Sequence, residues 1–386
     1  MRKVCFVTGS RAEYGIMSRL MRLVKDDPEL QIQIIATNMH LLPEFGYTYK
    51  EIENDGFAID RKIDMSVPGD TANSVVKSMG KELQGMADAY EDLKPDLIVV
   101  LGDRYEILVA VEAALIFKIP VAHISGGDIT EGAYDDAIRH AITKMSHLHF
   151  PTTEAYRNRI IQMGEQPEHV WNMGSLAIDN MRHLQLMSKD EFEKSINFEL
   201  DKTTVLVTFH PVTLENNSAE GQCEELLRAL DSTGYKIIFT MPNSDNNGQV
   251  IIDKINDFVA KHSDKSVAFK SLGYFRYLSA LQYVKYVAGN SSSGLAEVPS
   301  FHIPTINIGD RQKGRLRSKS VIDCAPNREE ILEAFKKADE MYIHGTLKDV
   351  RNIYEQPDTA AKMLEIIKHH PLEGICIKKF YNLETH

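Results

Sequence analysis

Short runs of β-branched residues alternate with amphipathic stretches along the chain, and this alternation constrains the fold more than any other feature of the sequence. In the first half the strand-like runs are VCFVT, IQIIAT, LIVVLG and PVAHIS, at residues 4–8, 32–37, 97–102 and 120–125. Apolar residues at helical spacing lie between these runs. Strands separated by helices form βαβ units, so the sequence predicts an α/β fold with doubly wound parallel sheets.

The alternation pauses at a polar stretch, Asp179–Leu200, and then resumes. The later strand-like runs lie at residues 203–210, 235–240, 266–270, 286–290 and 303–309. The pause predicts two Rossmann-like domains: residues 1–180 with the acid/base candidates, and residues 181–370, followed by a tail at 371–386. An alternative for the helix-like segment 359–370 is that it packs back across the first half.

Composition narrows the possible partners and compartments. The 386 residues include 44 Lys and Arg against 55 Asp and Glu, and the net charge of −11 argues against nucleic acid. The most apolar stretch, residues 107–117, contains Glu112 and is too short to cross a bilayer, so no membrane partner is expected. The amino terminus lacks a signal-peptide cleavage region, and the four cysteines have no metal or disulfide spacing. We therefore expect a cytoplasmic protein without a metal site.

Acidic residues follow two strand-like runs of the first half, at the ends where parallel α/β sheets bind ligands. Asp103 directly follows LIVVLG, and HISGGDITEGAYDDAIRH at residues 123–140 adds a Gly-Gly turn and four acids. Such a cluster is expected to raise at least one carboxyl pKa and to supply a general acid or base. The structural alternatives are helix capping and favourable helix-dipole interactions. The candidate catalytic residues of this half are Asp103, Asp128, Glu131, Asp135, Asp136 and Arg139.

Polar and basic residues follow strand-like runs of the second half. His210 is a candidate acid, base or phosphate donor, and GNSSSGLAE at residues 289–297 offers hydroxyl and backbone N–H groups that suit a diphosphate. The basic segment at residues 308–320 suits a small polyanion, although a serine-rich helix cap and a solvated or RNA-binding basic loop are alternatives. The candidate binding residues are Arg11, Asn243, Ser291, Ser292, Ser293, Glu297, Arg311 and Arg315. The chain has neither a Walker A motif nor G-x-G-x-x-G, which leaves kinase and nicotinamide functions without support.

Several motifs together resemble the hydrolysing UDP-N-acetylglucosamine 2-epimerases of sialic and legionaminic acid biosynthesis. They occur in order over nearly the whole chain: GSRAEYG, GDRYE, HISGGD, DDAIRHAITKMSHLH, GSL, GNSSSGLAEVPS and INIGDRQKGR. The resemblance implies a glycosyltransferase-B-like fold with the active site in the cleft between two domains. It also implies a UDP-sugar substrate, no cofactor or catalytic metal, and a homodimer or homotetramer.

The resemblance further implies that UDP is eliminated from UDP-N-acetylglucosamine and that water adds to the resulting glucal to give N-acetylmannosamine. By motif position, Asp103, Asp135 and Asp136 resemble the acid/base group. Arg139 and His210 resemble residues that support charge near the leaving diphosphate. The residues that resemble UDP contacts are Arg11, Ser292, Ser293, Glu297 and Arg315, and Tyr277 is a candidate for stacking on uracil or for the core.

Ser125 departs from the family pattern, because several members carry at this position a Glu that is a proposed catalytic acid. Asp128 or Glu131 would have to compensate, or the sugar would have to differ. A sub-branch that hydrolyses UDP-2,4-diacetamido-2,4,6-trideoxyglucose is compatible with ITEGA at residues 129–133. The primary expectation is a hydrolysing UDP-N-acetylglucosamine 2-epimerase, and the diacetamido-sugar enzyme is its alternative. A nucleotide-sugar sensor without turnover is a third hypothesis, and the GTRPE and EAGLR patterns of non-hydrolysing epimerases are not matched.

Overall fold

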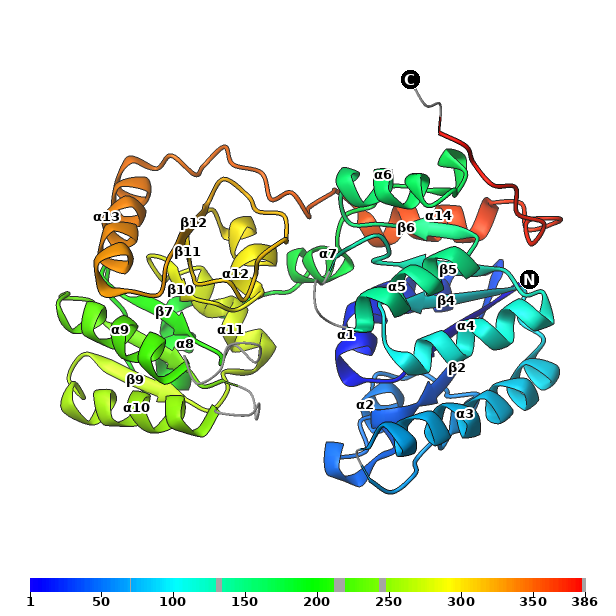
Figure 1. Ribbon diagram of the computed structural model, residues 1–386, viewed down its shortest axis with the longest axis horizontal. Helices are drawn as coiled ribbons and strands as arrows, with labels where there is room; N and C mark the ends of the chain where they lie inside the picture. The colour runs from blue at the N-terminus through cyan, green and yellow to red at the C-terminus, as the bar shows by residue number, and fades with distance from the viewer. Residues whose placement is uncertain (70, 130–133, 212–218, 243–247, 384–386) are drawn as a thin grey trace. The chain divides into compact units, whose positions relative to one another are not determined.

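Two compact α/β units make up the chain in a computed structural model that describes residues 1–69, 71–129, 134–211, 219–242 and 248–383. Unit 1 comprises Met1–Arg182 together with Tyr354–His386, and unit 2 comprises His183–Ile353. In the described residues, each unit is built around its own parallel sheet of six strands (Figure 1). Within the described residues, every helix is too short or too polar to cross a membrane.

The sheet of unit 1 has the strand order β3-β2-β1-β4-β5-β6, and all of its neighbouring strands are parallel. The strands are β1 (Arg2–Thr8), β2 (Leu30–Thr37), β3 (Arg61–Ile63), β4 (Leu97–Leu101), β5 (Val121–Ile124) and β6 (Leu148–Phe150). The strand order reverses between β1 and β4, so the loops that follow these two strands leave the sheet on opposite faces. Such a switch point is where doubly wound sheets bind ligands.

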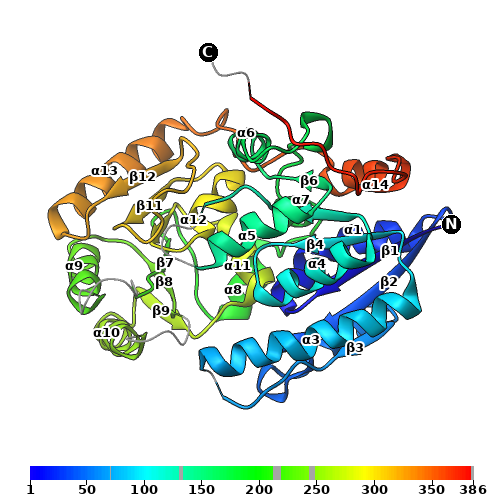
Figure 2. The ribbon, with the colours of Figure 1, turned by 45° about the vertical axis from the view of Figure 1, so that its right-hand side comes forward.

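Helices cover both faces of this sheet. They are α1 (Arg11–Asp26), α2 (Tyr49–Asn54), α3 (Ala72–Leu93), α4 (Tyr105–Phe117), α5 (Tyr134–Met145), α6 (Glu154–Gln162), α7 (Leu176–Arg182) and α14 (Thr359–His369). Successive residues of a strand point to opposite faces. Val4 and Phe6 of β1 therefore pack with α1 and α14, whereas Cys5 and Val7 pack with α3 and α4. Helices α3 and α4 run side by side on that second face (Figure 2).

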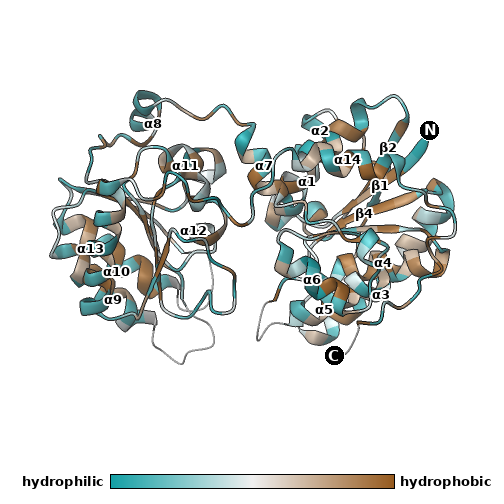
Figure 3. Ribbon diagram, turned by 90° about the horizontal axis from the view of Figure 1, so that it is seen from above, coloured by the Kyte–Doolittle hydropathy of each residue, from teal (hydrophilic) through white to brown (hydrophobic). Residues whose placement is uncertain are grey.

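Unit 2 repeats the architecture with the strand order β12-β11-β10-β7-β8-β9, again parallel throughout. Its strands are β7 (Val205–Thr208), β8 (Ile237–Thr240), β9 (Ser266–Phe269), β10 (Val287–Gly289), β11 (Thr305–Ile308) and β12 (Val321–Cys324). Its helices are α8 (Lys189–Ile196), α9 (Ala219–Asp231), α10 (Gly248–Lys261), α11 (Gly273–Leu281), α12 (Ser293–Ala296) and α13 (Arg328–His344). Apolar residues concentrate on the strands of both units (Figure 3), because helices cover both faces of a parallel sheet.

Gly289 at the end of β10 allows close contact between two neighbouring strands of unit 2. Its φ of +137° lies in a region that residues with a side chain rarely adopt, and a Cβ placed there would overlap the backbone carbonyl of Thr208 on β7. Only glycine fits this position without moving one of the strands. The polar residues that follow β10 are thereby kept beside the end of β7.

The carboxy-terminal segment returns to unit 1 after the chain has completed unit 2. Ala360, Met363 and Ile367 of α14 are fully buried in the core beside α1. At the start of α14, the carboxylate of Asp179 on α7 accepts from the backbone N–H groups of residues 359 and 360 and pairs with Arg19 at 3.1 Å. Asp179 thus ties α7, α1 and α14 together.

Residues beyond α14 continue along unit 1 and are held by side-chain contacts. The Lys378 ammonium lies 2.6 Å from the buried Glu165 carboxylate and donates to the carbonyl of Lys144 at 2.7 Å. Glu165 also lies 3.1 Å from Nε2 of His149 and pairs with Lys144 at 2.8 Å. Burial opposes the shift, but His149 above all, together with Lys144 and Lys378, holds the pKa of Glu165 down at about 2. The backbone N–H of Tyr381 donates to the carbonyl of Gly164 at 2.9 Å.

The predicted fold class, two doubly wound α/β domains, is confirmed. The division of the chain differs from the predicted domains at residues 1–180, 181–370 and 371–386, because everything from Tyr354 onward belongs to unit 1. The reason is tertiary: the apolar face of α14 fills the space beside α1, as the alternative for this segment described. The short strands β3 and β12 lie at the edges of their sheets and were not among the predicted strands.

Candidate functional site

The carboxyl ends of β1, β4 and β5 lie next to one another at one edge of the unit 1 sheet, on both sides of its switch point. Each end is followed by a motif that the sequence singled out: Gly9-Ser10-Arg11, Gly102-Asp103-Arg104 and Ser125-Gly126-Gly127-Asp128. Helix α5 follows the third motif and carries further acids at its start, Asp135 and Asp136. The topology therefore places the described candidate residues of this half, Asp103, Asp128, Asp135, Asp136 and Arg139, at one edge of the sheet.

Arg139 organises this acidic cluster. Its side chain is 7% exposed, and its Nη2 forms an ion pair with Oδ2 of Asp103. Its Nη1 lies 3.5 Å from Oδ1 of Asp136 and donates to the backbone carbonyl of Asp128 at 3.0 Å. One guanidinium thus joins the end of β4, the Gly-Gly loop and helix α5. Asp103 does not cap α4, because Arg104 occupies the N-cap position, so the capping alternative for Asp103 is not observed.

Asp135 has the raised pKa that the sequence predicted for at least one acid of the cluster. Burial is the main cause, and the negative charge of Asp103 adds to it, whereas Arg104 and Arg139 oppose the shift. A carboxyl that keeps its proton to higher pH is suited to act as a general acid. Asp136, one residue further, lies 3.5 Å from Nε2 of His140. The edge of unit 1 therefore offers carboxyl groups in different electrostatic environments within one cluster.

Three buried glutamates lie next to this cluster, and sequence reasoning missed them. Glu13 on α1, Glu82 on α3 and Glu106 on α4 are at most 5% exposed. Burial raises the pKa of Glu13 to about 8 and that of Glu82 to about 9, and the charge of Glu106 contributes to both shifts. The cation beside them is Arg104, whose Nε pairs with Glu106 and lies 3.8 Å from Glu13. Glu13 and Glu106 stand within the quoted motifs GSRAEYG and GDRYE, so their positions just after strand ends were the available signal.

Gly9 makes this arrangement of glutamates possible. Its backbone N–H donates to Oε2 of Glu13 at 2.8 Å, and a Cβ added at Gly9 would overlap the carboxyl group of Glu106. Arg11, two residues further, pairs with a glutamate of α2. Its Nε pairs with Glu51 at 2.9 Å, and its side chain is 72% exposed.

In unit 2, His210 and Asn290 connect the carboxyl ends of β7 and β10. The backbone N–H of His210 donates to Oδ1 of Asn290 at 2.7 Å, and Nδ2 of Asn290 donates to the His210 carbonyl at 2.8 Å. The carbonyl of Asn290 accepts from Nη1 of Arg311 at 3.1 Å and from Nε2 of Gln312 at 2.9 Å. The imidazole of His210, Arg311 and the first serines of the GNSSSG motif thus stand at the same edge of the sheet.

The serines of that motif lie at the start of a short helix, where Oγ of Ser291 accepts from the backbone N–H of Ser293 at 3.4 Å. Ser292 is the N-cap of α12, but its side chain makes no capping hydrogen bond, and the hydroxyl of Ser293 donates to the Tyr277 oxygen at 2.7 Å. Burial raises the pKa of Glu297, which follows α12. The cap alternative therefore accounts for Ser291 but not for Ser292 or Ser293, and Tyr277 belongs to the same cluster.

Apart from Arg11, which pairs with Glu51, the described candidate residues fall into two sets, one in each unit. The unit 1 group is Asp103, Asp128, Asp135, Asp136 and Arg139. The unit 2 group is His210, Tyr277, Ser291, Ser292, Ser293, Glu297, Arg311 and Arg315. Glu131 and Asn243 lie outside the described residues. In the described part of the chain, no group of three or more His, Cys, Asp or Glu side chains is arranged to hold a metal ion.

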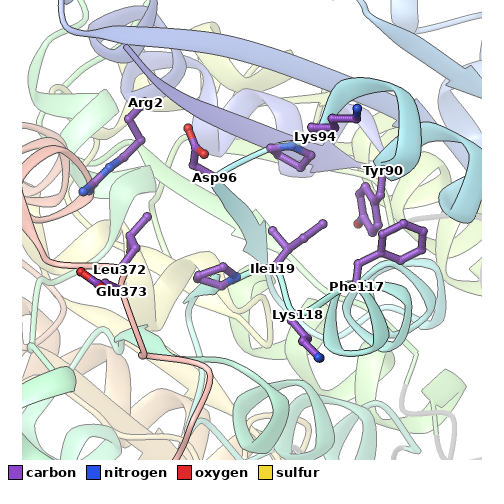
Figure 4. Close-up of a pocket in the computed structure, with 11 residues that line it drawn as sticks. Arg2, Tyr90, Lys94, Asp96, Phe117, Lys118, Ile119, Leu372 and Glu373 are labelled. Atoms are coloured by element: carbon purple, nitrogen blue, oxygen red, sulfur yellow. The ribbon is translucent and has the colours of Figure 1, made fainter.

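A pocket of about 720 Å³ lies at the other edge of the unit 1 sheet (Figure 4). Its lining includes Arg2 on β1, Asp96 just before β4 and Ile119 just before β5. These residues stand at the amino ends of the strands, whereas ligands of parallel sheets bind at the carboxyl ends. We therefore place the candidate site at the edge that carries Asp103 and not in this pocket.

Two doubly wound units of this kind define the class of glycosyltransferase-B-like α/β proteins. Among solved structures, the UDP-GlcNAc 2-epimerase of Neisseria meningitidis bound to UDP-GlcNAc shares the fold. Its TM-score is 0.76 at 19% sequence identity, covering 95% of this chain and 99% of the other. The profile of the UDP-N-acetylglucosamine 2-epimerase family matches residues 22–368. The chain belongs to this family, which confirms the resemblance of the sequence motifs.

Several curated relatives match most of the chain, among them two hydrolysing 2-epimerases. A GDP/UDP-N,N'-diacetylbacillosamine 2-epimerase (hydrolyzing) of Campylobacter jejuni is 44% identical over 87% of this chain and 87% of its own length. A UDP-N,N'-diacetylbacillosamine 2-epimerase (hydrolyzing) of Legionella pneumophila is 33% identical over 98% of this chain and 99% of its own length. Both names describe a hydrolysing reaction on a diacetamido sugar.

Proposed function

We propose that the protein is a hydrolysing 2-epimerase that acts on UDP-N,N'-diacetylbacillosamine, the UDP-2,4-diacetamido-2,4,6-trideoxyglucose of the sequence analysis. The observation that carries this proposal is the likeness to the two hydrolysing diacetylbacillosamine 2-epimerases, which extends over nearly the full length of each. This substrate was the alternative in the sequence expectation, and the relatives favour it over UDP-N-acetylglucosamine.

The proposed reaction breaks the C2–H bond and the bond between C1 and the diphosphate oxygen, and UDP leaves with that electron pair. Water then adds its oxygen to C1 of the glucal, and a proton returns to C2 on the opposite face. The first step needs a base near C2, and the second needs an acid. We assign Asp103, Asp135 and Asp136 to this acid/base group, with Asp135 as the acid because its pKa is raised.

Departure of UDP needs positive charge and hydrogen-bond donors for the diphosphate. We propose that the unit 2 group supplies them: the imidazole of His210, the hydroxyl and backbone N–H groups of residues 291–293, and the guanidinium groups of Arg311 and Arg315. Glu297 is the candidate acceptor for ribose hydroxyls. Tyr277, beside Ser293, is the candidate residue for stacking on the uracil ring. We further propose that Arg11 contacts UDP. Its ion pair with Glu51 is exposed to solvent and therefore weak, so Arg11 can leave Glu51 when UDP binds.

Ser125 is the position at which the chain differs from family members that carry Glu. A serine hydroxyl is not a base at neutral pH, so the proton transfer assigned to that Glu must come from another group. Asp128, three residues further, is held in the loop by Arg139, which donates to its backbone carbonyl. We propose Asp128, or Glu131 in the same segment, for this role.

The second candidate function is conversion of UDP-N-acetylglucosamine to UDP and N-acetylmannosamine, which the description of the matching family favours. Purified protein is to be incubated with each UDP-sugar in deuterated water, with UDP release measured and the sugar product identified by NMR. We expect release from the diacetamido sugar, with solvent deuterium at C2 of the product. Turnover of UDP-N-acetylglucosamine alone would establish the second candidate. UDP binding without turnover of either sugar would establish a sensor.

The subunit arrangement proposed from the family resemblance is a homodimer or homotetramer. Light scattering coupled to size-exclusion chromatography tests this proposal directly, because the chain mass is 43.6 kDa. A mass near that of a single chain at micromolar concentration would contradict it.

A further inference from the structure

His123 is a fully buried histidine on β5 that stands between the two elements carrying Asp103 and Arg139. Its Nε2 lies 2.8 Å from the backbone carbonyl oxygen of Gly102, the residue before Asp103. Its Nδ1 lies 3.1 Å from the hydroxyl of Thr143, one helical turn after Arg139 on α5. The ring therefore spans from the end of β4 to helix α5.

The two partners fix how the ring carries its proton. A carbonyl oxygen only accepts hydrogen bonds, so Nε2 must carry the hydrogen and donate to Gly102. Nδ1 is then the acceptor, and the Thr143 hydroxyl donates to it. Burial lowers the pKa of His123 to about 3, and His149, Arg139 and His140 add to the shift, so the ring is neutral at physiological pH. Both ring nitrogens are used in one tautomer.

The backbone around Asp103 is held from two sides through this contact. Gly102 adopts a left-handed conformation with φ of +82°, and its N–H donates to the carbonyl of Ile124 on β5 at 3.1 Å. Its own carbonyl is the group that accepts from His123. The N–H and the carbonyl of Gly102, the residue before Asp103, are therefore both hydrogen-bonded to β5.

Gly126 of the Gly-Gly turn lies against the hydrogen bond between His123 and Thr143 and leaves room for it. A Cβ added at Gly126 would lie 2.8 Å from the Thr143 hydroxyl and 2.9 Å from Nδ1 of His123. Real Cβ atoms do not approach that closely, so a side chain at this position would push the hydroxyl and the ring apart. Gly126 is needed because the histidine and the threonine meet directly beneath it.

We propose that His123 is a positioning residue, which holds the Gly102 peptide and helix α5 together so that the carboxylate of Asp103 meets the guanidinium of Arg139. The proposal rests on the proposed function for its kinetic consequence, because Asp103 is assigned there to the acid/base group. An apolar side chain would fill the same volume without the cost of burying a polar ring. This position instead holds an imidazole. One of its nitrogens bonds to Gly102, next to Asp103, and the other bonds to Thr143, on the same helix as Arg139.

Two substitutions of His123 separate positioning from simple filling of the core. The amide nitrogen of His123→Gln reaches the place of Nε2 and retains a donor for Gly102, whereas His123→Asn ends near the place of Nδ1. We expect His123→Asn to lower kcat by about 100-fold, because a shift of about 1 Å in a catalytic group has that effect. His123→Gln is expected to remain within about tenfold of the wild type. KM and the Kd for UDP are expected to change little in both variants.

Thr143 supplies a second pair of variants that perturb the core less. Thr143→Val removes the hydroxyl at nearly constant volume, and Thr143→Ser keeps it. We expect kcat to fall about tenfold in the valine variant and to recover in the serine variant. If the asparagine and glutamine variants at residue 123 lose kcat equally, or if both Thr143 variants turn over alike, the positioning role is refuted.

A spectroscopic measurement on the wild type tests the proposal without turnover. With ¹⁵N-labelled histidine, His123 is assigned as the signal missing from the His123→Gln spectrum. We expect the pattern of a neutral ring with its hydrogen on Nε2, unchanged between pH 5 and pH 8. A hydrogen on Nδ1, or titration within that range, would overturn the inference. If no UDP-sugar is turned over by the wild type, the proposed function fails, whereas this measurement still decides the role of the ring.

Discussion

Replacing Glu82 by Gln tests how strongly the buried glutamates beside the candidate site depend on pH. Glu82 lies on α3 with 0% exposure, and its carboxyl interacts electrostatically with the carboxyl groups of Glu106 and Glu13. Burial and these neighbours raise its pKa from an ordinary value of 4.5 to about 9. A glutamine keeps nearly the same shape and is neutral at every pH.

The sign and size of the effect follow from the two pKa values. Between pH 4.5 and pH 9 the folded protein holds a proton on Glu82 that the unfolded chain has released. The contribution to stability is therefore complete below pH 4.5 and is lost progressively as the pH rises toward 9. The slope is about 1.4 kcal/mol per pH unit, which gives about 3 kcal/mol between pH 6 and pH 8.

Urea unfolding at pH 6 and pH 8 measures this difference. Trp171 is the single tryptophan of the chain and lies in unit 1, so its fluorescence reports on the unit that contains Glu82. Relative to the wild type, Glu82→Gln is expected to gain about 3 kcal/mol in the free energy of unfolding on going from pH 6 to pH 8. Glu91→Gln, an exposed position on the same helix, is the matched control and is expected to show no such gain. An equal difference between Glu82→Gln and the wild type at both pH values would refute the reasoning from burial.

Other substitutions test the site and the fold separately. Asp103→Asn and Asp135→Asn are each expected to lower kcat, measured as UDP release, by about 100-fold or more, and near-wild-type turnover would remove the residue from the acid/base group. Gly289→Ala is expected to destabilise unit 2 by about 3 kcal/mol or more, because its Cβ would overlap the backbone of β7; an unchanged unfolding midpoint would contradict this. Lys378→Met removes a partner of the buried Glu165 carboxylate and is expected to lower the stability of unit 1 by about 2 kcal/mol, as read from tryptophan fluorescence.

Most of the fold could be predicted because the central strands are buried on both faces and therefore appear as continuous apolar runs. Strands β1, β4 and β7 are of this kind. Strand β3, Arg61–Ile63, has three residues, of which two are exposed, so it leaves no apolar run. The sequence could not predict against which unit α14 packs, for a different reason. Its amphipathic pattern predicts a helix with one buried face, but only tertiary packing decides which core that face joins.

The sequence could predict those site residues that directly follow a strand, because ligands of parallel sheets bind at the carboxyl ends of the strands. Asp103 was found in this way, and its contact with Arg139, 36 residues further, brings together two motifs that the sequence could only present separately. Glu82 was missed because it lies within a helix, where an acid indicates a solvent-facing side chain. His123 was missed as a site residue because it belongs to an apolar strand, and its two hydrogen bonds join groups distant in sequence.

The return of the carboxy-terminal segment to unit 1 has a consequence for synthesis on the ribosome. Unit 2 is one continuous stretch, so its residues have all been translated before those that unit 1 still lacks. The buried side chains of Ala360, Met363 and Ile367 are translated after the whole of unit 2, so the core beside α1 cannot be completed before then. Domains often mature in the order in which they are translated. Here unit 1 is the first to be translated in part, but its last residues are translated only after all of unit 2.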